Sequence, residues 1–541
     1  MVAIKSLQKK QHLGVTLLLL FIIGIGVWIR IAHFPKIPPG FNQDEACTAV
    51  EAFALSETGK DKWGDAWPAY FRSWGSGQNV LMAYLIIPFI KVFGLNIFSI
   101  RILPLILGIL TLPLLYGAVR ALGRYASLLT VFVVAVVPWH FMLSRWGLES
   151  NLVPFFMLLG CAMVIQAINT QKPAWIAACL VPFALSLYAY GTTVVVLPGL
   201  LLLLLLAFRK RIALRWPYWL AAVGLFAVVA APFALVILEN FILHKNLAWT
   251  DKLFFSTPLL EVNRLQQVNE ANQQHEWQML RHNWAFVNSG FNDGSSYNMI
   301  QGFRPLFSFT ILLFVVALAV MLYRVLRPKW PVAESRRDVV AWVFFAWAVA
   351  SLPLFFVIDL NINRFNHFYL PCLVLSVWVI DLIIRNINDN VPKTAIRAVV
   401  VLWFAVEGGL VVRDYFAEYP SSRIREDFNV GLKEAFDEAE RLPGVRQVLV
   451  TTHMPLPYVY TLFFSKYPPA RFQQDKSYEL VNGLYDVKRV GKFVFAESTL
   501  EPGRDFGYLM RKNQMQDTDK WRHEPLFGND YWEVGIVRVL P

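Results

Sequence analysis

The chain has 541 residues, of which 56% are hydrophobic and only 16% are charged, and its formal net charge is +12. Charged residues make up about a quarter of an average soluble domain, so this composition excludes an ordinary soluble protein. The basic excess does not indicate a nucleic-acid partner, because lysines and arginines cluster between apolar runs, where they set membrane topology. The four cysteines show neither a disulfide framework nor a metal-binding spacing.

The apolar runs predict membrane spans. A span needs about 20 predominantly apolar residues, and runs such as VVVLPGLLLLLLLAF (194–208) contribute to segments of this kind. The first run, at about 13–32, is too long for a signal-peptide core and has no small-residue cleavage site after it. We therefore expect a retained span, with Lys5, Lys9 and Lys10 on the cytoplasmic side.

The number of spans depends on the segment NVLMAYLIIPFIKVF (79–93). It is apolar but short and contains Pro88 and Lys91, so we expect it to be re-entrant or interfacial. If it does not span, basic segments such as RALGR (120–124) and FRKRIALRW (208–216) face the cytoplasm, as the positive-inside rule requires. The sequence then predicts about eleven transmembrane helices. They are expected near residues 13–32, 98–120, 125–142, 151–168, 174–190, 192–208, 216–238, 306–326, 339–357, 367–385 and 394–412.

Two large loops and a tail face outward in this register. We expect a transmembrane domain over residues 1–412, with a first outer loop at 35–97 and a second large outer loop at 239–305. The tail, 413–541, has the composition of a soluble extracytoplasmic domain. The fold class is therefore a polytopic α-helical membrane protein with a small C-terminal α/β domain.

The tail contains one amphipathic segment and several strand-like ones. SRIREDFNVGLKEAFDEAERL (422–442) predicts a helix, and Pro443-Gly444 follows it. Strands are expected within 445–452, 491–498 and 532–540, which are strand-like segments.

Two adjacent carboxylates, Asp44 and Glu45, come soon after the first span in PPGFNQDEACTAVEAF (38–53). One interpretation is structural: a helix starts here, with Asn42 or Asp44 as its N-cap and Glu45 in its first turn. The other is a catalytic carboxylate at the membrane surface. Adjacent residues point about 100° apart on a helix, so both cannot face one reacting atom. One of them would react while the other caps or pairs.

A second group of candidates lies in PWHFMLSRWGLESNLVP (138–154). Arg145 and Glu149 are four residues apart, would share a helix face, and are expected on the same side of the membrane as Asp44. They form either a structural ion pair or part of a site. His140 is a candidate substrate-binding residue, although a lone histidine without metal-ligand spacing is more typical of a packed or solvated side chain.

A third group is DLNINRFNHFYLP (359–371), a short outer turn. Arg364 is either an interfacial anchor or a ligand for a lipid phosphate, since a guanidinium presents a planar fork of donors to phosphate oxygens.

The arrangement resembles the GT-C membrane glycosyltransferases, specifically the bacterial family 39 or ArnT-like group, which is related to the protein O-mannosyltransferases and to aminoarabinose transferase. The resemblance rests on the Asp-Glu pair after the first span, on VFGLNIFSIRILP (92–104) before the second and on PWHFMLSRWGLES (138–150) after the third. It covers about residues 10–410. It implies transfer of a sugar from a polyprenyl-phosphate-linked donor to a hydroxyl of a lipid, glycan or protein acceptor.

The resemblance also implies roles for single residues. The family's catalytic base falls on Asp44, and its phosphate-associated arginine is best matched by Arg364. The second acidic position is often Asp in relatives and is Glu149 here, which leaves open whether it orients the acceptor or pairs with Arg145. Inversion at the anomeric carbon is expected from the family. The scheme requires no metal cofactor, although Asp44 with Glu149 could bind a divalent ion.

The second outer loop could cover the sugar, because aromatic faces stack on sugar rings and amides bond to their hydroxyls. Tyr297 and Asn298 are the main candidates, but tryptophan and tyrosine are also ordinary interfacial residues. Further candidates in this loop are Lys252, Arg264, Arg281 and Trp284. We expect the enzyme in the cytoplasmic (inner) membrane, surrounded by membrane lipid, with its site and C-terminal domain on the outer or periplasmic side.

Two other classes of protein stay open. A transporter or flippase of lipid-linked sugars would place charged or helix-breaking residues near mid-membrane in two matching halves, and no such symmetry is visible in the sequence. A non-catalytic membrane scaffold would explain the tail but not the gathering of Asp44, Arg145, Glu149 and Arg364 at one level.

Overall fold

The computed structural model describes residues 2–73, 77–260, 273–326, 335–388, 390–481 and 484–540. The chain forms two compact units, each assembled from separate stretches of sequence. Unit 1 comprises Met1–Phe34, Pro104–Ala231 and Ala271–Tyr419, and unit 2 comprises Pro35–Leu103, Pro232–Glu270 and Pro420–Pro541. The predicted boundary between residues 412 and 413 falls inside helix α18 (Lys393–Ala417).

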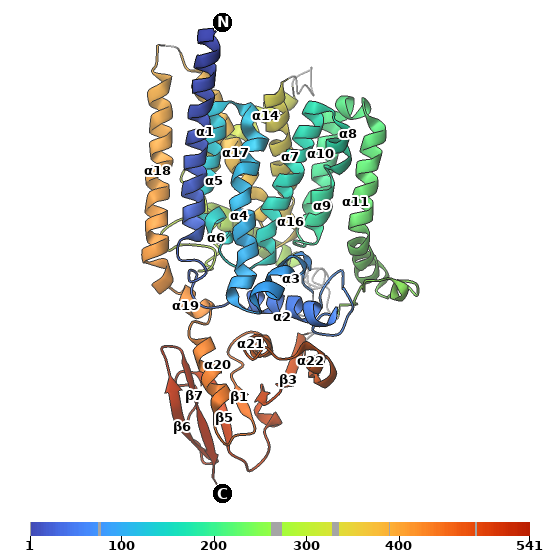
Figure 1. Ribbon diagram of the computed structural model, residues 1–541, viewed down its shortest axis with the longest axis vertical. Coiled ribbons are helices and arrows are strands. Elements are labelled where there is room, and N and C mark those ends of the chain that lie inside the picture. The colour runs from blue at the N-terminus through green and yellow to red at the C-terminus, as the bar shows by residue number, and fades with distance from the viewer. Residues whose placement is uncertain are drawn as a thin grey trace. The chain divides into compact units, whose positions relative to one another are not determined.

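Unit 1 is built of helices (Figure 1). They are α1 (Val2–Ile31), most of α4 (Ile97–Val119), α5 (Arg124–Val136), α6 (Pro138–Leu143), α7 (Val153–Thr170), α8 (Pro173–Ala178), α9 (Val181–Leu187), α10 (Thr193–Ala213), most of α11 (Trp216–Ile237), α13 (Gln273–Asn288), α14 (Thr310–Val325), α15 (Arg336–Ser351), α16 (Leu354–Val357), α17 (Asn366–Asn386) and α18. The break between α5 and α6 lies at Val137, which is extended because Pro138 follows it.

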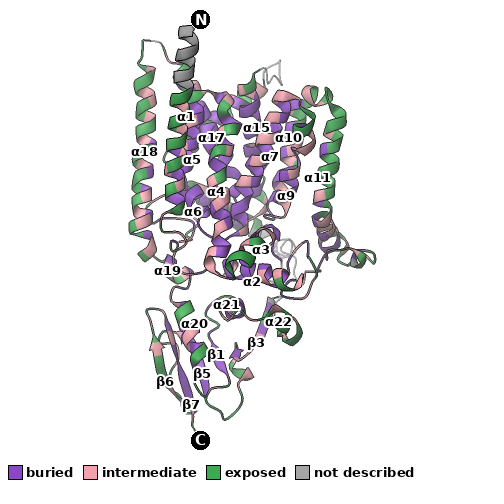
Figure 2. Ribbon diagram, in the orientation of Figure 1, coloured by how far each residue is buried: buried purple, intermediate pink, exposed green. Residues whose placement is uncertain are grey.

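Helix α17 forms the centre of unit 1. It packs against α5, α7, α14, α15 and α18. In its most apolar stretch of 18 residues, 89% is buried inside the protein, and its ribbon is largely purple in Figure 2. The corresponding buried share is 22% for α1 and 17% for α18, so most of their apolar side chains point outward. Such large exposed apolar faces are typical of helices that contact lipid.

The predicted spans coincide with observed helices. Within the described residues, eight helices are long and apolar enough to cross a membrane. They are Leu13–Ile31, Ile97–Leu122, Glu149–Thr170, Thr193–Ala213, Trp216–Leu243, Arg336–Val357, Asn366–Asn386 and Lys393–Ser421. The other three predicted spans coincide with the shorter apolar helices Arg124–Val136, Pro173–Leu187 and Thr310–Val325. The predicted polytopic helical fold with a C-terminal α/β domain is confirmed.

Unit 2 combines parts of both outer loops with the tail. Its first-loop helices are α2 (Gln43–Thr58) and α3 (Leu81–Phe93), which pack against each other. Helix α3 has 13 residues, which span about 20 Å. That length is shorter than the roughly 30 Å hydrocarbon core of a bilayer, in keeping with the expectation that segment 79–93 does not cross it.

The tail of unit 2 forms a mixed sheet with helices. The helices are α19 (Ile424–Asp427), α20 (Leu432–Arg441), α21 (Pro457–Phe464) and α22 (Pro469–Asp475). The strands are β1 (Val448–Val450), β2 (Ser477–Val481), β3 (Leu484–Val490), β4 (Phe493–Val494), β5 (Phe506–Arg511), β6 (Trp521–Gly528) and β7 (Trp532–Val539). Their order is β2-β3-β4-β1-β5-β7-β6, and β1 pairs in parallel with both β4 and β5 while the other pairs are antiparallel.

The three predicted strands are present as β1, β4 and β7, but the single helix predicted over 422–442 is wrong. Helix α19 ends at Asp427 and α20 begins at Leu432. Between them Asn429 and Gly431 adopt the left-handed conformation, with φ of 47° and 82°. Asparagine and glycine tolerate this conformation best, so they interrupt the helical pattern here.

Candidate functional site

The N-terminus of α2 is fixed by a capping box. The side chain of Asn42 accepts a hydrogen bond from the Asp44 N–H at 2.9 Å, and the Glu45 carboxylate accepts one from the Asn42 N–H at 3.2 Å. Asn42 is therefore the N-cap, one of the two candidates that the sequence offered. The capping work is done by Asn42 and Glu45, and Asp44 contributes its backbone N–H.

Glu45 is also paired with a buried arginine. Arg101 donates from Nε and Nη2 to the two Glu45 carboxylate oxygens at 2.8 and 2.7 Å, and both side chains are at most 1% exposed. The same guanidinium donates to the carbonyl oxygens of Pro35, Pro38 and Gly40 at 2.7–2.9 Å. This bidentate pair fixes the chain that leads into α2. Glu45 thus has the capping and pairing role expected for one of the two carboxylates.

Asp44 is half-buried at the second position of α2. Its charge acts on two buried neighbours within unit 2. The pKa of the Cys47 thiol is raised to about 12, chiefly by burial, and Asp44 adds to this rise. The pKa of the Tyr460 phenol is raised far above its usual value by burial and by the charges of Cys47 and Asp44. Asp44 therefore lies within electrostatic reach of two buried side chains of unit 2.

Sequence analysis missed a group of buried charges at the far end of α2. Lys62 forms an ion pair with Glu51, and both side chains are at most 1% exposed. Asp61 is also fully buried, and its Oδ1 accepts from the N–H groups of Trp63 and Asp65 at 2.9 Å. Burial, with the charges of Glu51 and Asp65, raises the pKa of Asp61 to about 8. The one sign of these buried charges in the sequence was Glu51, a charged residue within an otherwise apolar helical segment.

In unit 1, Arg145 caps the C-terminus of α1. Its guanidinium donates to the carbonyl oxygens of Ile29, Arg30 and Ala32 at 2.6–2.8 Å, and it also lies against the rings of Tyr415 and Phe416, 5.4 and 5.5 Å from their centroids. A cation at the end of a helix complements the partial negative charge of its last carbonyls. Arg145 is fully buried by these contacts.

The expected shared helix face of Arg145 and Glu149 is wrong. Helix α6 ends at Leu143, and a 3₁₀ turn begins at Glu149 and leads into α7. The residues between them are not helical, so the spacing of four does not place them on one helix face. Glu149 is half-buried at the start of this turn.

His140 is a packed residue in α6. Its Nδ1 lies 2.6 Å from Nη2 of Arg30. The Arg30 guanidinium also donates to carbonyl oxygens, from Nη1 to those of Gly26 and Ala135 and from Nη2 to that of Val134. Arginine has no acceptor, so Nδ1 accepts this hydrogen bond and the imidazole is the neutral Nε2–H tautomer. Both side chains are at most 1% exposed. This geometry matches the structural interpretation of His140.

Arg364 lines a polar cavity of about 410 Å³ in unit 1. The other lining residues come from α13, the loop after it and the turn before α17: Gln278, Met279, His282, Asp293, Ser295, Asp359, Leu360 and Asn361. Nη1 of Arg364 donates to the Asp359 carbonyl oxygen at 2.8 Å. Within the described residues, Nε and Nη2 of Arg364 and the Asp359 carboxylate have no protein partner. Donors and acceptors thus face one space, which suits a ligand with phosphate and hydroxyl groups.

The walls of this cavity are held by amide and carboxylate side chains. Asn283 donates to the carbonyl oxygens of Phe355 and Ile358 at 2.7 and 2.8 Å and accepts from the Leu360 N–H at 2.7 Å. Asp293 accepts from the side chain of Asn298 at 3.1 Å and from the Ile362 N–H at 3.0 Å. The predicted residue Asn298 is therefore buried behind Asp293 and supports the cavity.

The other second-loop candidates do not all gather at this cavity. The Tyr297 ring packs against Trp146, with centroids 5.4 Å apart. Trp284 lies on α13 and is 64% exposed. Arg264 lies outside the described residues. Among the described residues, no group of three or more histidine, cysteine, aspartate or glutamate side chains could hold a metal ion.

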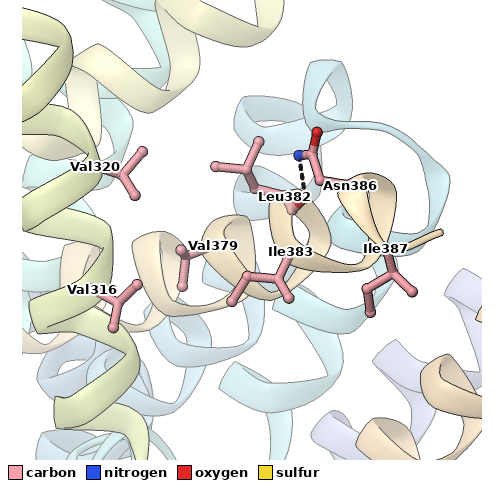
Figure 3. Close-up of a pocket in the computed structure, with 7 residues that line it drawn as sticks. All are labelled: Val316, Val320, Val379, Leu382, Ile383, Asn386 and Ile387. Atoms are coloured by element: carbon pink, nitrogen blue, oxygen red, sulfur yellow. Dashed lines mark hydrogen bonds between the residues drawn. The ribbon is translucent and has the colours of Figure 1, made fainter.

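A second cavity, of about 390 Å³, lies between α14 and α17 and is almost entirely apolar. Figure 3 shows its lining, in which the only polar side chain is Asn386, whose amide donates to the Leu382 carbonyl oxygen at 2.7 Å. This cavity offers no charged or nucleophilic group, so it is not a candidate for the chemistry.

The comparisons with known proteins place the fold. A family model described as dolichyl-phosphate-mannose-protein mannosyltransferase matches residues 78–234, which contain Arg145 and Glu149 but neither Asp44 nor Arg364. ArnT from Cupriavidus metallidurans bound to undecaprenyl phosphate has a similar structure, with a TM-score of 0.52 at 12% identity over 97% of this chain and 98% of that one. The chain has the GT-C fold. The resemblance drawn from the sequence is thereby confirmed.

Other solved structures with the GT-C fold are longer than this chain. An oligosaccharyltransferase from Archaeoglobus fulgidus in complex with Zn and sulfate gives a TM-score of 0.48 at 14% identity, over 81% of this chain and 60% of that one. AglB from the same organism, with an inhibitory peptide and a dolichol-phosphate, gives 0.47 at 14% identity, over 91% of this chain and 62% of that one. The chain thus spans about three fifths of these two proteins. No curated protein sequence matches it.

Proposed function

We propose that the protein is a glycosyltransferase that moves a sugar from a polyprenyl-phosphate-linked donor to a hydroxyl of a lipid, glycan or protein acceptor. Asp44 is the base that takes the proton of the acceptor hydroxyl. The hydroxyl oxygen attacks the anomeric carbon from the face opposite the phosphate, so the configuration inverts. The bond between that carbon and the phosphate oxygen breaks, and polyprenyl phosphate leaves.

The observation that carries this proposal is the difference in role between the two adjacent carboxylates at the start of α2. Asn42 and Glu45 cap the helix and Arg101 neutralises Glu45, so Glu45 has a structural role and the base is assigned to the other carboxylate of the pair, Asp44. A base needs a carboxylate within hydrogen-bond reach of the acceptor hydroxyl. Asp44 is half-buried, and its charge acts on the buried side chains of Cys47 and Tyr460.

Arg364 is proposed as the ligand of the donor phosphate. It lines a cavity together with Asp359 and Asn361, and its Nη1 donates to the Asp359 carbonyl oxygen. The departing phosphate gains negative charge, and a guanidinium stabilises that charge without a general acid. The known complex of ArnT with undecaprenyl phosphate is in keeping with a donor of this class.

The remaining candidates take supporting roles in this proposal. Glu45 and Arg145 hold backbone segments in place, and His140 and Asn298 hold the side chains of Arg30 and Asp293. Glu149 and Tyr297 are the candidates that orient the acceptor or the sugar. The scheme needs no metal.

The proposed location is the cytoplasmic (inner) membrane, with the site and the C-terminal domain on its outer, periplasmic side. The support is the distribution of lysine and arginine, because the basic segments 120–124 and 208–216 then lie on the cytoplasmic side.

Donor consumption by the purified protein tests the proposal. We would incubate it in nanodiscs with a panel of polyprenyl-phosphate sugars and membrane extract as acceptor source, and follow each donor by chromatography. Wild type should consume one donor, Asp44→Asn should not, and Glu57→Gln, which alters an exposed carboxylate on the same helix, should match wild type. Equal consumption by wild type and Asp44→Asn would remove Asp44 from the chemistry. Failure of wild type on every donor would favour the transporter or scaffold.

A further inference from the structure

The C-terminal domain contacts the turn that leads into α2. The Phe41 N–H donates to the Phe428 carbonyl oxygen at 2.5 Å, and the Phe41 ring lies 4.4 Å from the ring of Phe463, centroid to centroid. Gly40 has a φ of 74°, and a Cβ at this position would clash with the Phe428 carbonyl. Only glycine permits both this backbone conformation and this close approach. The turn at Gly40 and Phe41 therefore packs closely against the tail, and it ends three residues before Asp44.

A chain of polar side chains, in which Asn429 and Tyr460 are buried and Arg511 is half-buried, connects this turn to the sheet. Asn429 donates from Nδ2 to the Tyr460 hydroxyl oxygen and accepts at Oδ1 from Nη2 of Arg511, both at 2.8 Å. The Tyr460 hydroxyl in turn lies 3.5 Å from the Phe41 carbonyl oxygen. Arg511, at the end of β5, stacks on the Trp532 ring with its Cζ 4.0 Å from the centroid. A network of this kind holds its members rigidly, because each buried polar group needs its partner.

The far end of α2 is held by different residues of the same domain. Gln473 donates to the Thr58 hydroxyl at 3.1 Å and to the Asp61 carbonyl oxygen at 2.7 Å. Lys476 donates to the Trp63 carbonyl oxygen at 2.7 Å. Both ends of the helix that carries Asp44 are thus attached to the tail, although more than 350 residues of sequence separate them.

We infer that the C-terminal domain contributes to the active site by positioning Asp44 through its Arg511–Asn429–Tyr460 chain. This inference rests on the proposed function. Tyr460, Asn429 and Arg511 are positioning residues: they act on the reaction through the turn at Gly40 and Phe41. A misplacement of about 1 Å at a reacting group can cost on the order of 100-fold in rate, so the chain matters for kcat more than for substrate binding.

The first test is steady-state kinetics of two variants. Tyr460→Phe removes one hydroxyl and keeps the ring packing, and Arg511→Gln removes the cation that holds Asn429. Each should lower kcat about 10- to 100-fold and change the donor KM less than about threefold. Arg511→Lys, which keeps a donor, should restore part of kcat. The matched control is Arg538→Gln on the neighbouring strand β7, whose side chain is 56% exposed, and it should match wild type.

The second test is amide hydrogen exchange of the peptide that covers residues 40–47. Faster exchange in Tyr460→Phe and Arg511→Gln, together with the fall in kcat, supports the inference. Unchanged exchange overturns it, and so does faster exchange with an unchanged kcat, because the turn would then move without affecting Asp44. If wild type transfers no sugar, the proposed function fails, and with it the link to catalysis. Exchange alone then decides whether the tail holds the helix.

Discussion

Replacing Asp61 by asparagine is expected to stabilise the protein increasingly as the pH rises. Asp61 is fully buried in unit 2, its Oδ1 accepts two backbone N–H groups, and its Oδ2 has no donor within the described residues. Burial and the neighbouring charges of Glu51 and Asp65 raise its pKa from 3.8 to about 8. Asparagine keeps the shape and the acceptor, and it cannot ionise.

The sign and size follow from linkage. In the unfolded chain Asp61 loses its proton near its ordinary pKa, whereas in the folded protein it keeps that proton up to about pH 8. Between these values the folded state binds one more proton, so the free energy of unfolding falls by about 1.4 kcal/mol per pH unit. From pH 5 to pH 7 the advantage of Asp61→Asn over wild type should therefore grow by about 3 kcal/mol.

Thermal unfolding followed by tryptophan fluorescence measures this effect. The difference in Tm between Asp61→Asn and wild type should widen by several degrees from pH 5 to pH 7 and level off above about pH 8. Glu57→Gln, which alters an exposed carboxylate on α2, should show a difference that does not depend on pH. The same flat profile for Asp61→Asn would refute the reasoning.

Three further substitutions probe the other assignments. Arg364→Gln should lower kcat/KM for the donor about 10- to 100-fold, with a fall in kcat, since one charge-assisted hydrogen bond contributes about 1.5–3 kcal/mol and this one strengthens as the phosphate gains charge; steady-state kinetics would contradict this if kcat/KM stayed at the wild-type value. Arg145→Lys should lower Tm without changing the donor KM, because one ammonium cannot donate to three carbonyls in the geometry of a guanidinium; an altered KM at unchanged Tm would assign the residue to substrate binding. Glu45→Gln should cost about 3–5 kcal/mol of stability, because Arg101 would keep its buried charge without a counter-charge. Size-exclusion chromatography and Tm measure that loss, and an unchanged profile would contradict it.

The membrane helices and the tail strands were predicted from local sequence patterns. Long apolar runs have few alternatives to spanning a bilayer, and the observed helices coincide with the eleven predicted segments. The start of α2 was also predicted from a local pattern, because Pro-Pro-Gly followed by Asn42 is a strong helix-start signal.

Partners far apart in the sequence were not predictable in this way. Arg101 lies 56 residues from Glu45, and Arg145 caps a helix that ends more than 110 residues earlier. Periodicity says which face of a helix is apolar, but not which distant carbonyl a guanidinium reaches. For the same reason the sequence indicated a separate tail domain, whereas the tail forms one compact unit with the first outer loop.

Two local predictions failed where the backbone leaves the helical conformation. The spacing of Arg145 and Glu149 has meaning only on a helix, and α6 ends at Leu143. The tail helix was expected to continue through Asn429 and Gly431, which adopt left-handed conformations. Asn429 then bonds to Tyr460, whose hydroxyl lies 3.5 Å from the Phe41 carbonyl oxygen in the turn before α2.

The dependence of rate on pH tests the role of Asp44 most directly. For wild type, kcat/KM measured over a wide pH range should fall on the acid side with a single ionisation, which reports the base of the free enzyme. Asp44→Asn should lower kcat/KM by about 10²- to 10⁴-fold and abolish that acid limb, while Glu57→Gln should reproduce the wild-type profile. An Asp44→Asn enzyme with wild-type rate and the same acid limb would contradict the account.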